Sequence, residues 1–160
     1  MGTNADVEKL CHSSIGGELT IAEASILASI MGLQKVKDAE VISSEGGDSN
    51  TLFVLIEGKL DVISSDENRD HVVYTMQKGE CAGTRAFVDL TPRKATLRAH
   101  GDAVVYTMEP SDFESLLDNH PGIIYKVMRA LFRNTHSNLM RMNKETEQLS
   151  NYISKSGGRY

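Results

Sequence analysis

The chain has 160 residues, of which 40% are hydrophobic and 24% charged, a composition typical of one folded globular domain. Its 17 basic and 22 acidic residues leave a formal net charge of −5, without a dense block of Lys and Arg, which argues against wrapping nucleic acid or docking on anionic lipid. The sequence has no apolar run near the roughly 20 residues of a membrane span and no signal-peptide core. Its two cysteines match no metal or redox spacing, so we expect a reduced, cytoplasmic protein.

The N-terminal part is predicted to hold an arm and one helix. Residues 1–17 are polar and contain glycines, which predicts a flexible arm. Residues 20–23 have the order of a capping box, in which Thr20 bonds the N3 amide and Glu23 reaches back. Apolar residues then recur at helical spacing, so residues 20–33 are predicted to form an amphipathic helix. These residues are Ile26, Leu27, Ile30, Met31 and Leu33.

From about residue 39, short β-prone runs alternate with turn residues. Turns are expected at Glu57-Gly58 and Gly101-Asp102, and a polar loop over residues 64–70. Many short strands at regular spacing are typical of a sandwich or a roll. The predicted strands are 40–44, 51–56, 59–63, 71–76, 95–100 and 103–108.

Two helices are predicted after the strands. Residues 111–114 have the order of a second capping box, opening a short helix that Asn119-His120-Pro121 ends. Pro121 suits the first turn of the next helix, because its missing N–H would be unpaired there anyway. That long helix is expected to end near residue 152. The expected organisation is an arm over 1–17, a β-rich unit with flanking helices over 18–120, a long helix over 121–153 and a tail over 154–160.

The long helix carries an apolar seam with alternating steps of four and three residues, which is typical of a coiled coil. We favour a parallel homodimer through this helix, with packing on its own domain as the alternative. For the first turns, residues 124–131, packing on the domain is the better interpretation. Arg129, Arg133 and Arg141 are expected to be solvated. The seam residues are Met128, Phe132, Thr135, Leu139, Met142, Thr146, Leu149 and Ile153.

The stretch over residues 79–96, "GECAGTRAFVDLTPRKAT", joins a glycine-containing loop to one arginine. It resembles the phosphate-binding cassette of the cyclic-nucleotide-binding domain, F-G-E-x-A-L followed by P-R-x-A-T, and Gly83 and Arg93 are ten residues apart as in that family. Residues 46–63 look like the family's second and third strands. The resemblance covers about residues 18–140. It implies an α+β, mainly β fold, a double-stranded β-helix (a jelly-roll-like β-roll) with an N-terminal helix and two C-terminal helices, the last one long.

The residues of this stretch suit a cyclic phosphate, which carries one negative charge. Gly83 lets the backbone approach closely, and the amides near Ala86 and Phe87 can point at the charge. Arg93 would add a charge-assisted hydrogen bond, and the amide of Ala95 could also reach the phosphate. The predicted ligand-binding residues are Gly83, Thr84, Arg85, Ala86, Arg93, Lys94, Ala95 and Asn138.

Two departures from the family pattern bear on the ligand. Thr84 stands where the family has the glutamate that accepts the ribose 2′-hydroxyl, and Ala82 replaces a phenylalanine. Losing the charged acceptor would cost about ten- to hundredfold in affinity. Alternatively, the lost carboxylate and the added Arg85 suit a different or more highly charged anion. In the family, polar side chains of the long helix reach the base, which here indicates Asn138 or, as the alternative, a plain surface asparagine.

The sequence favours a binding module over an enzyme. No P-loop, zincin or nucleophile-elbow pattern occurs, the five histidines lie at no ligand spacing, and no cofactor or metal is expected. Too few residues follow the long helix for a helix-turn-helix, so direct DNA binding is not expected. The favoured hypothesis is a sensor of a cyclic nucleotide, cAMP before cGMP, or of another small anion, which signals through its C-terminal helices to an unidentified protein partner. The alternative is a degenerate dimeric scaffold that binds no nucleotide.

Overall fold

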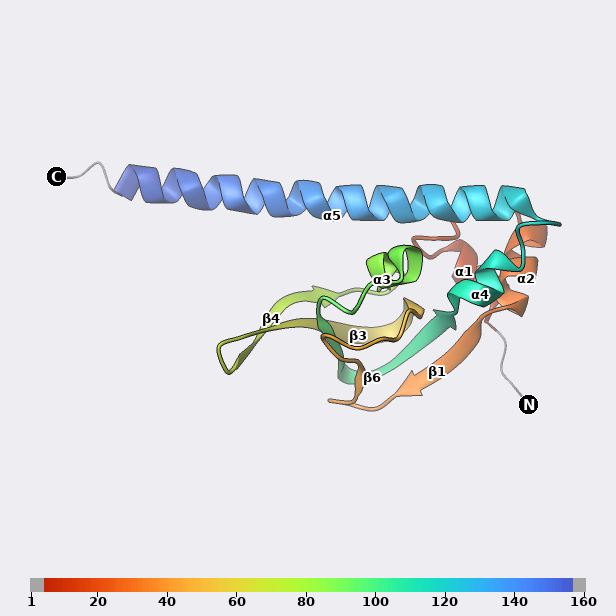
Figure 1. The fold of residues 1–160 in the computed structure, drawn as a ribbon, viewed down its shortest axis with the longest axis horizontal. Coiled ribbons are helices and arrows are strands. Elements are labelled where there is room, and N and C mark those ends of the chain that lie inside the picture. The colour runs from red at the N-terminus through yellow and green to blue at the C-terminus, as the bar shows by residue number, and fades with distance from the viewer. Residues whose placement is uncertain (1–4, 157–160) are drawn as a thin grey trace.

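The computed structural model describes residues 5–156. Six strands form a roll flanked by N-terminal helices and a long C-terminal helix, which confirms the predicted fold class (Figure 1). In chain order the elements are α1 (Val7–Cys11), α2 (Ile21–Ser29), β1 (Gly32–Val36), β2 (Val41–Ser43), β3 (Leu52–Asp66), β4 (Arg69–Met76), β5 (Cys81–Ala82), α3 (Thr84–Asp89), β6 (Thr96–Met108), α4 (Pro110–Glu114) and α5 (Pro121–Ser156).

The strands pair antiparallel in the order β1-β6-β3-β4, with β2 added on β6 and β5 on β3. The strands predicted separately over 51–56 and 59–63 are one strand, β3, and those over 95–100 and 103–108 are one strand, β6. The predicted turn at Gly58 is instead an irregularity in the β3–β6 pairing. Gly58 has a φ of 83°, and a Cβ there would lie 2.4 Å from the Asp102 carbonyl oxygen. Glycine therefore permits a bulge between two strands that continue past it.

The expected flexible arm is wrong for residues 5–17. Asp6 caps α1 by accepting from the Lys9 amide, and its own amide donates to the Tyr106 hydroxyl at 2.8 Å. Leu10 and Ile15 are almost completely buried in the core. Two well-spaced apolar side chains thus anchor a segment whose composition is mostly polar. Residues 1–4 of the predicted arm lie outside the described residues.

The capping box at the start of α2 is confirmed, with Thr20 and Glu23 bonding each other's backbone amides. The predicted helix over 20–33 is wrong at its end, because α2 stops at Ser29 and Leu33 belongs to β1. Gly32 pairs with Thr107 across the sheet, and a Cβ on it would lie 2.7 Å from the Thr107 hydroxyl oxygen. The apolar spacing of Leu33 fits a helix and a strand equally well.

The second predicted capping box, over residues 111–114, is wrong. The observed N-cap is Glu109, two residues before the predicted Ser111, and its side chain does not cap α4, which begins at Pro110. Helix α5 begins at Pro121 as predicted and includes residues 154–156, which were expected to be tail. Residues 157–160 lie outside the described part of the chain. Within residues 5–156, no helix is long and apolar enough to cross a membrane.

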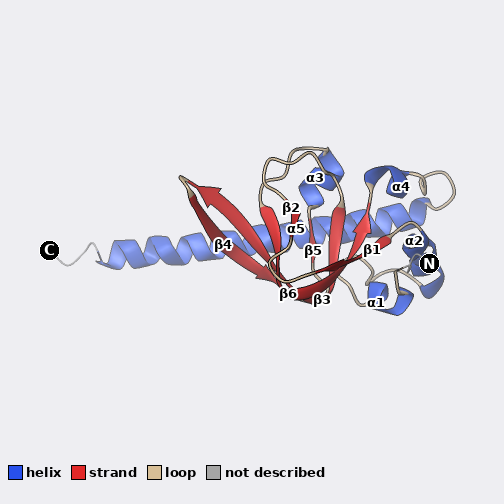
Figure 2. Cartoon of the chain, turned by 90° about the horizontal axis from the view of Figure 1, so that it is seen from below, coloured by secondary structure: helices blue, strands red, loops and turns tan. Residues whose placement is uncertain are grey.

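Helix α5 packs into the hydrophobic core of the domain through its first turns. Val127 and Leu131 are buried in a core shared with α1, α2, α3 and α4, which confirms the predicted packing there, and a second core fills the roll. Arg129 and Arg133, expected to be solvated, both pair with Glu18. Every described side chain from residue 142 onward is exposed. In both orientations the C-terminal end of α5 extends past the tip of the β3–β4 hairpin (Figures 1 and 2).

Candidate functional site

The cassette is a short helix entered and left through left-handed backbone. Gly83 follows β5 with a φ of 86°, and Leu90 ends α3 with a φ of 58°. A Cβ on Gly83 would lie 2.3 Å from Arg93 Nη1 and 2.9 Å from the Thr51 carbonyl oxygen. The first bond of the helix joins the Phe87 amide to the Gly83 carbonyl. The three amides that precede it, those of residues 84–86, are therefore donors at the positive end of α3.

Arg93 is a buried cation held from one side. It is 6% exposed, and its Nη2 donates to the Thr51 carbonyl oxygen at 2.6 Å and to Ser49 Oγ at 3.3 Å. Its guanidinium lies over the Phe53 ring, 5.4 Å from the centroid. Its Nε and Nη1 atoms are buried without a hydrogen-bond partner. Buried donors without partners are costly, and such donors on a cation suit an incoming anion.

Burial lowers the pKa of Arg93, and the charge of nearby Glu109 opposes that shift. An arginine side chain stays protonated even so. Among the described residues, no carboxylate pairs with Arg93 within 4.0 Å. The site thus keeps a full positive charge whose nearest counter-charge makes no direct contact with it.

A cavity of about 840 Å³ lies beside Arg93, between the cassette, β4 and α5. Its charged lining comprises Arg85, Arg93, Lys94 and Arg141 against Glu80 and Glu145, four cations against two anions. The potential inside therefore favours an anion. All eight residues predicted to bind ligand line this one cavity: Gly83, Thr84, Arg85, Ala86, Arg93, Lys94, Ala95 and Asn138.

The end of the cavity formed by β4 and α5 contains a cluster that the sequence did not predict. The Tyr74 hydroxyl donates to Glu80 Oε1 at 2.6 Å, and the Arg141 guanidinium lies 4.1 Å from the centre of the Tyr74 ring. The hydrogen bond to Glu80 and burial both raise the pKa of Tyr74, although Arg141 opposes them. Arg141, expected to be solvated, is thus part of the cavity wall. No local pattern marks these residues, since they meet only through the packing of α5 on the roll.

The two departures from the family pattern, Ala82 and Thr84, flank Gly83 and line the cavity. Thr84 Oγ1 lies 3.9 Å from Cys81 Sγ, to which Asn134 of α5 donates a hydrogen bond at 3.5 Å. The Cys81 sulfur therefore bridges the cassette and α5. Asn138, one turn beyond Asn134, lines the cavity and is exposed.

Residues 33–120 match the sequence profile of the cyclic nucleotide-binding domain. The lysophospholipase NTE1 of Mycosarcoma maydis is 27% identical over 112 residues, which cover 70% of this chain and 6% of that protein. A cAMP-dependent protein kinase regulatory subunit of the same organism is 27% identical over 124 residues, 74% of this chain and 24% of that one. The chain therefore spans only a small part of the length of these relatives.

Among solved structures, a cyclic nucleotide-binding domain from Methylobacillus flagellatus KT has the same fold. The two superpose with a TM-score of 0.83 over 91% of this chain and 86% of that one, at 18% sequence identity. At this identity the likeness concerns the fold alone.

Proposed function

The chain belongs to the cyclic nucleotide-binding domain family, and from this premise we propose that it is a ligand-sensing regulatory module that binds a cyclic nucleotide, cAMP in preference to cGMP. The ligand lies in the cavity beside Arg93. Its cyclic phosphate meets the two free guanidinium donors of Arg93 and the amides of residues 84–86. The proposed role is binding, with no reaction carried out by this chain.

The observation that carries the proposal is the state of Arg93. The Arg93 guanidinium is 6% exposed, and its Nε and Nη1 lack hydrogen-bond partners. A buried cation with unpaired donors destabilises a fold, so a purely structural role does not explain it. An anionic oxygen at these donors would form the charge-assisted bonds that the protein itself does not supply. The cavity volume, about 840 Å³, also lies in the range of small-molecule sites, roughly 300–1,000 Å³.

The sugar and base have less specific partners than the phosphate. Thr84 offers a neutral hydroxyl where a carboxylate would hold the ribose, so we expect weak discrimination of the 2′-hydroxyl. Asn138 of α5 presents an amide that can pair with an adenine edge. The stacked pair of Tyr74 and Arg141 adds a flat wall against which a purine can lie.

The signal passes from the cassette to the C-terminal helices. Phe87 of α3 packs against Phe113 of α4, with ring centroids 5.3 Å apart. Residues 115–120 join α4 to α5, which forms one wall of the cavity. A ligand that orders the cassette in one position therefore favours one position of α4 and α5. This is a shift between two states, driven by the difference in ligand affinity between them.

We further propose that the module is a homodimer through α5. Phe132, Leu139 and Leu149 of the predicted seam are each more than half exposed. An uncovered apolar stripe on a helix that extends beyond its own domain is suited to a second copy. Both cysteines are free, which favours a reducing compartment such as the cytoplasm. Because this stripe does not depend on the cassette, a dimeric scaffold without nucleotide binding is the second candidate.

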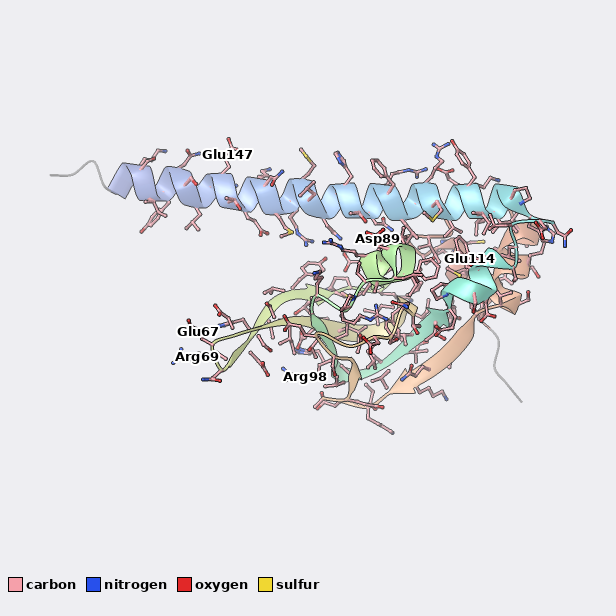
Figure 3. The ribbon with its side chains drawn as sticks, viewed as in Figure 1. Glu67, Arg69, Asp89, Arg98, Glu114 and Glu147 are labelled. Atoms are coloured by element: carbon pink, nitrogen blue, oxygen red, sulfur yellow. The ribbon has the colours of Figure 1, made fainter. Side chains whose placement is uncertain are left out.

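Calorimetric titration of cAMP and cGMP tests the proposal. Wild-type protein should bind cAMP at micromolar to submillimolar concentrations, and Arg93→Ala should abolish the binding heat. Arg69→Ala is the matched control, because it removes the same charge at the tip of the β3–β4 hairpin, far from the cassette (Figure 3). Absence of heat and of any thermal shift at millimolar cAMP and cGMP would overturn the sensor proposal and leave the scaffold.

A further inference from the structure

The Nη2 atom of Arg93 is held by residues outside the cassette. It donates to the Thr51 carbonyl oxygen and to Ser49 Oγ, at 2.6 and 3.3 Å. Thr51 and Ser49 lie just before β3, more than 40 residues before Arg93 in the chain. Nothing in the cassette motif specifies them. The direction in which the guanidinium points therefore depends on where the Thr51 backbone is fixed.

Thr51 is in turn fixed by Glu109. The Thr51 hydroxyl donates to Glu109 Oε1 at 2.5 Å, and it lies 3.3 Å from Ser49 Oγ. Glu109 comes directly after β6 and immediately before α4. The three residues thus join the end of one strand and the start of another behind the guanidinium. The Ser49 hydroxyl oxygen and the Thr51 carbonyl oxygen both accept from one Arg93 nitrogen, Nη2.

We propose that Glu109, acting through Thr51, is a positioning residue that holds the Arg93 guanidinium with Nε and Nη1 directed to the ligand. This inference rests on the proposed anion-binding function of Arg93. The carboxylate is near enough to stabilise the cation electrostatically but bonds Thr51 instead of Arg93. A direct pair would occupy the donors that the ligand needs. Holding the counter-charge one residue away leaves them free.

Glu109 also links the ligand site to the C-terminal helices. Its carbonyl oxygen accepts the Phe113 amide at 3.1 Å, which begins α4. Its side chain does not cap the helix, so replacing that side chain removes the contact with Thr51 without removing a helix cap. A substitution of the Glu109 side chain therefore tests its contact with Thr51 alone.

The test is a double-mutant cycle on the affinity for cAMP. Glu109→Ala and Thr51→Val should each lower the affinity for cAMP about three- to thirtyfold. The double variant should bind cAMP no more weakly than whichever single variant has the lower affinity. Glu109→Gln keeps an oxygen that accepts the Thr51 hydroxyl and should recover part of the loss. Glu114→Ala is the matched control, because it removes an exposed carboxylate at the other end of α4 and should leave affinity unchanged (Figure 3).

A second measurement needs no ligand and separates positioning from general stability. The Nε–H resonance of Arg93, identified by its loss in Arg93→Lys, should exchange slowly with water in the wild type, because the group is buried. Its exchange should quicken in Glu109→Ala and Thr51→Val but not in Glu114→Ala. Full additivity of the affinity losses in Glu109→Ala and Thr51→Val, or unchanged exchange of the Arg93 Nε–H in both variants, would overturn the positioning role. Failure of the wild type to bind cAMP would overturn the proposed function instead, and the exchange measurement would still decide whether Glu109 positions Arg93.

Discussion

Replacing Gly83 with alanine should disturb Arg93 directly. The new Cβ would lie 2.3 Å from Arg93 Nη1 and 2.9 Å from the Thr51 carbonyl oxygen, so the guanidinium must move off its anchor. The backbone at Gly83, with a φ of 86°, adds a cost of about 1–2 kcal/mol for a residue that carries a Cβ. Overpacking against the buried cation adds about 1–3 kcal/mol. Together these terms lower the free energy of unfolding by about 2–5 kcal/mol.

Gly101→Ala separates the two terms. Gly101 has a φ of 79°, and a Cβ added to it would meet nothing within 4 Å, so the variant carries only the backbone cost. The difference between the two variants should therefore be about 1–3 kcal/mol, or roughly 2–12 °C in Tm for a chain of this size. Differential scanning calorimetry measures it. Affinity for cAMP should fall in Gly83→Ala and persist in Gly101→Ala. Equal losses of Tm in the two variants would refute the steric part of the reasoning.

Three further outcomes are expected. Thr84→Glu should raise the affinity for cAMP about tenfold or more, because a carboxylate accepts the ribose hydroxyl, and it should leave 2′-deoxy-cAMP unaffected; equal gains for both ligands in calorimetry would contradict this. The hydrogen bond from Lys126 and, after it, the one from the Thr20 amide lower the pKa of Glu23 below its ordinary value of 4.5. The Lys126–Glu23 pair therefore stabilises the fold above about pH 4.5. That stabilisation is lost as the pH falls through the lowered pKa. The Tm difference between wild type and Lys126→Met should therefore be present at pH 7 and vanish in acid, and a constant difference would disprove the assignment. Leu149 lies on the exposed seam, and Leu149→Ser should shift the dimer toward monomer in sedimentation equilibrium. Met140 is apolar and similarly exposed but lies off the seam, so Met140→Ser should leave the dimer unchanged. Identical behaviour of the two variants would argue against the seam.

The cassette could be predicted because its geometry is determined by residues close together in the sequence. Gly83 supplies the left-handed turn and Arg93 follows at a fixed spacing, so one stretch of sequence brings the helix amides and the cation together. The capping box at Thr20 and the start of α5 at Pro121 were predictable for the same reason. Each depends only on neighbours along the chain.

Features that depend on partner strands were not predictable in this way. Whether Gly58 turns the chain or bulges within a strand is decided by the approach of Asp102 across the sheet. The anchoring of Arg93 by Thr51 depends likewise on contacts between distant segments. Arg141 was expected to be solvated as a charged residue on a helix, but α5 lies against β4 at that turn and places it over Tyr74. Local pattern indicates which residue types are available, and packing decides which of them meet.

The most direct test of the binding role of Arg93 is a crystal structure of the protein grown with cAMP. The cyclic phosphate should lie between the first amides of α3 and the Nε and Nη1 atoms of Arg93, while Nη2 keeps its bond to the Thr51 carbonyl oxygen. The base should lie toward α5, within reach of Asn138. A nucleotide bound elsewhere, or a cavity without nucleotide at saturating concentration, would contradict the assignment of this site.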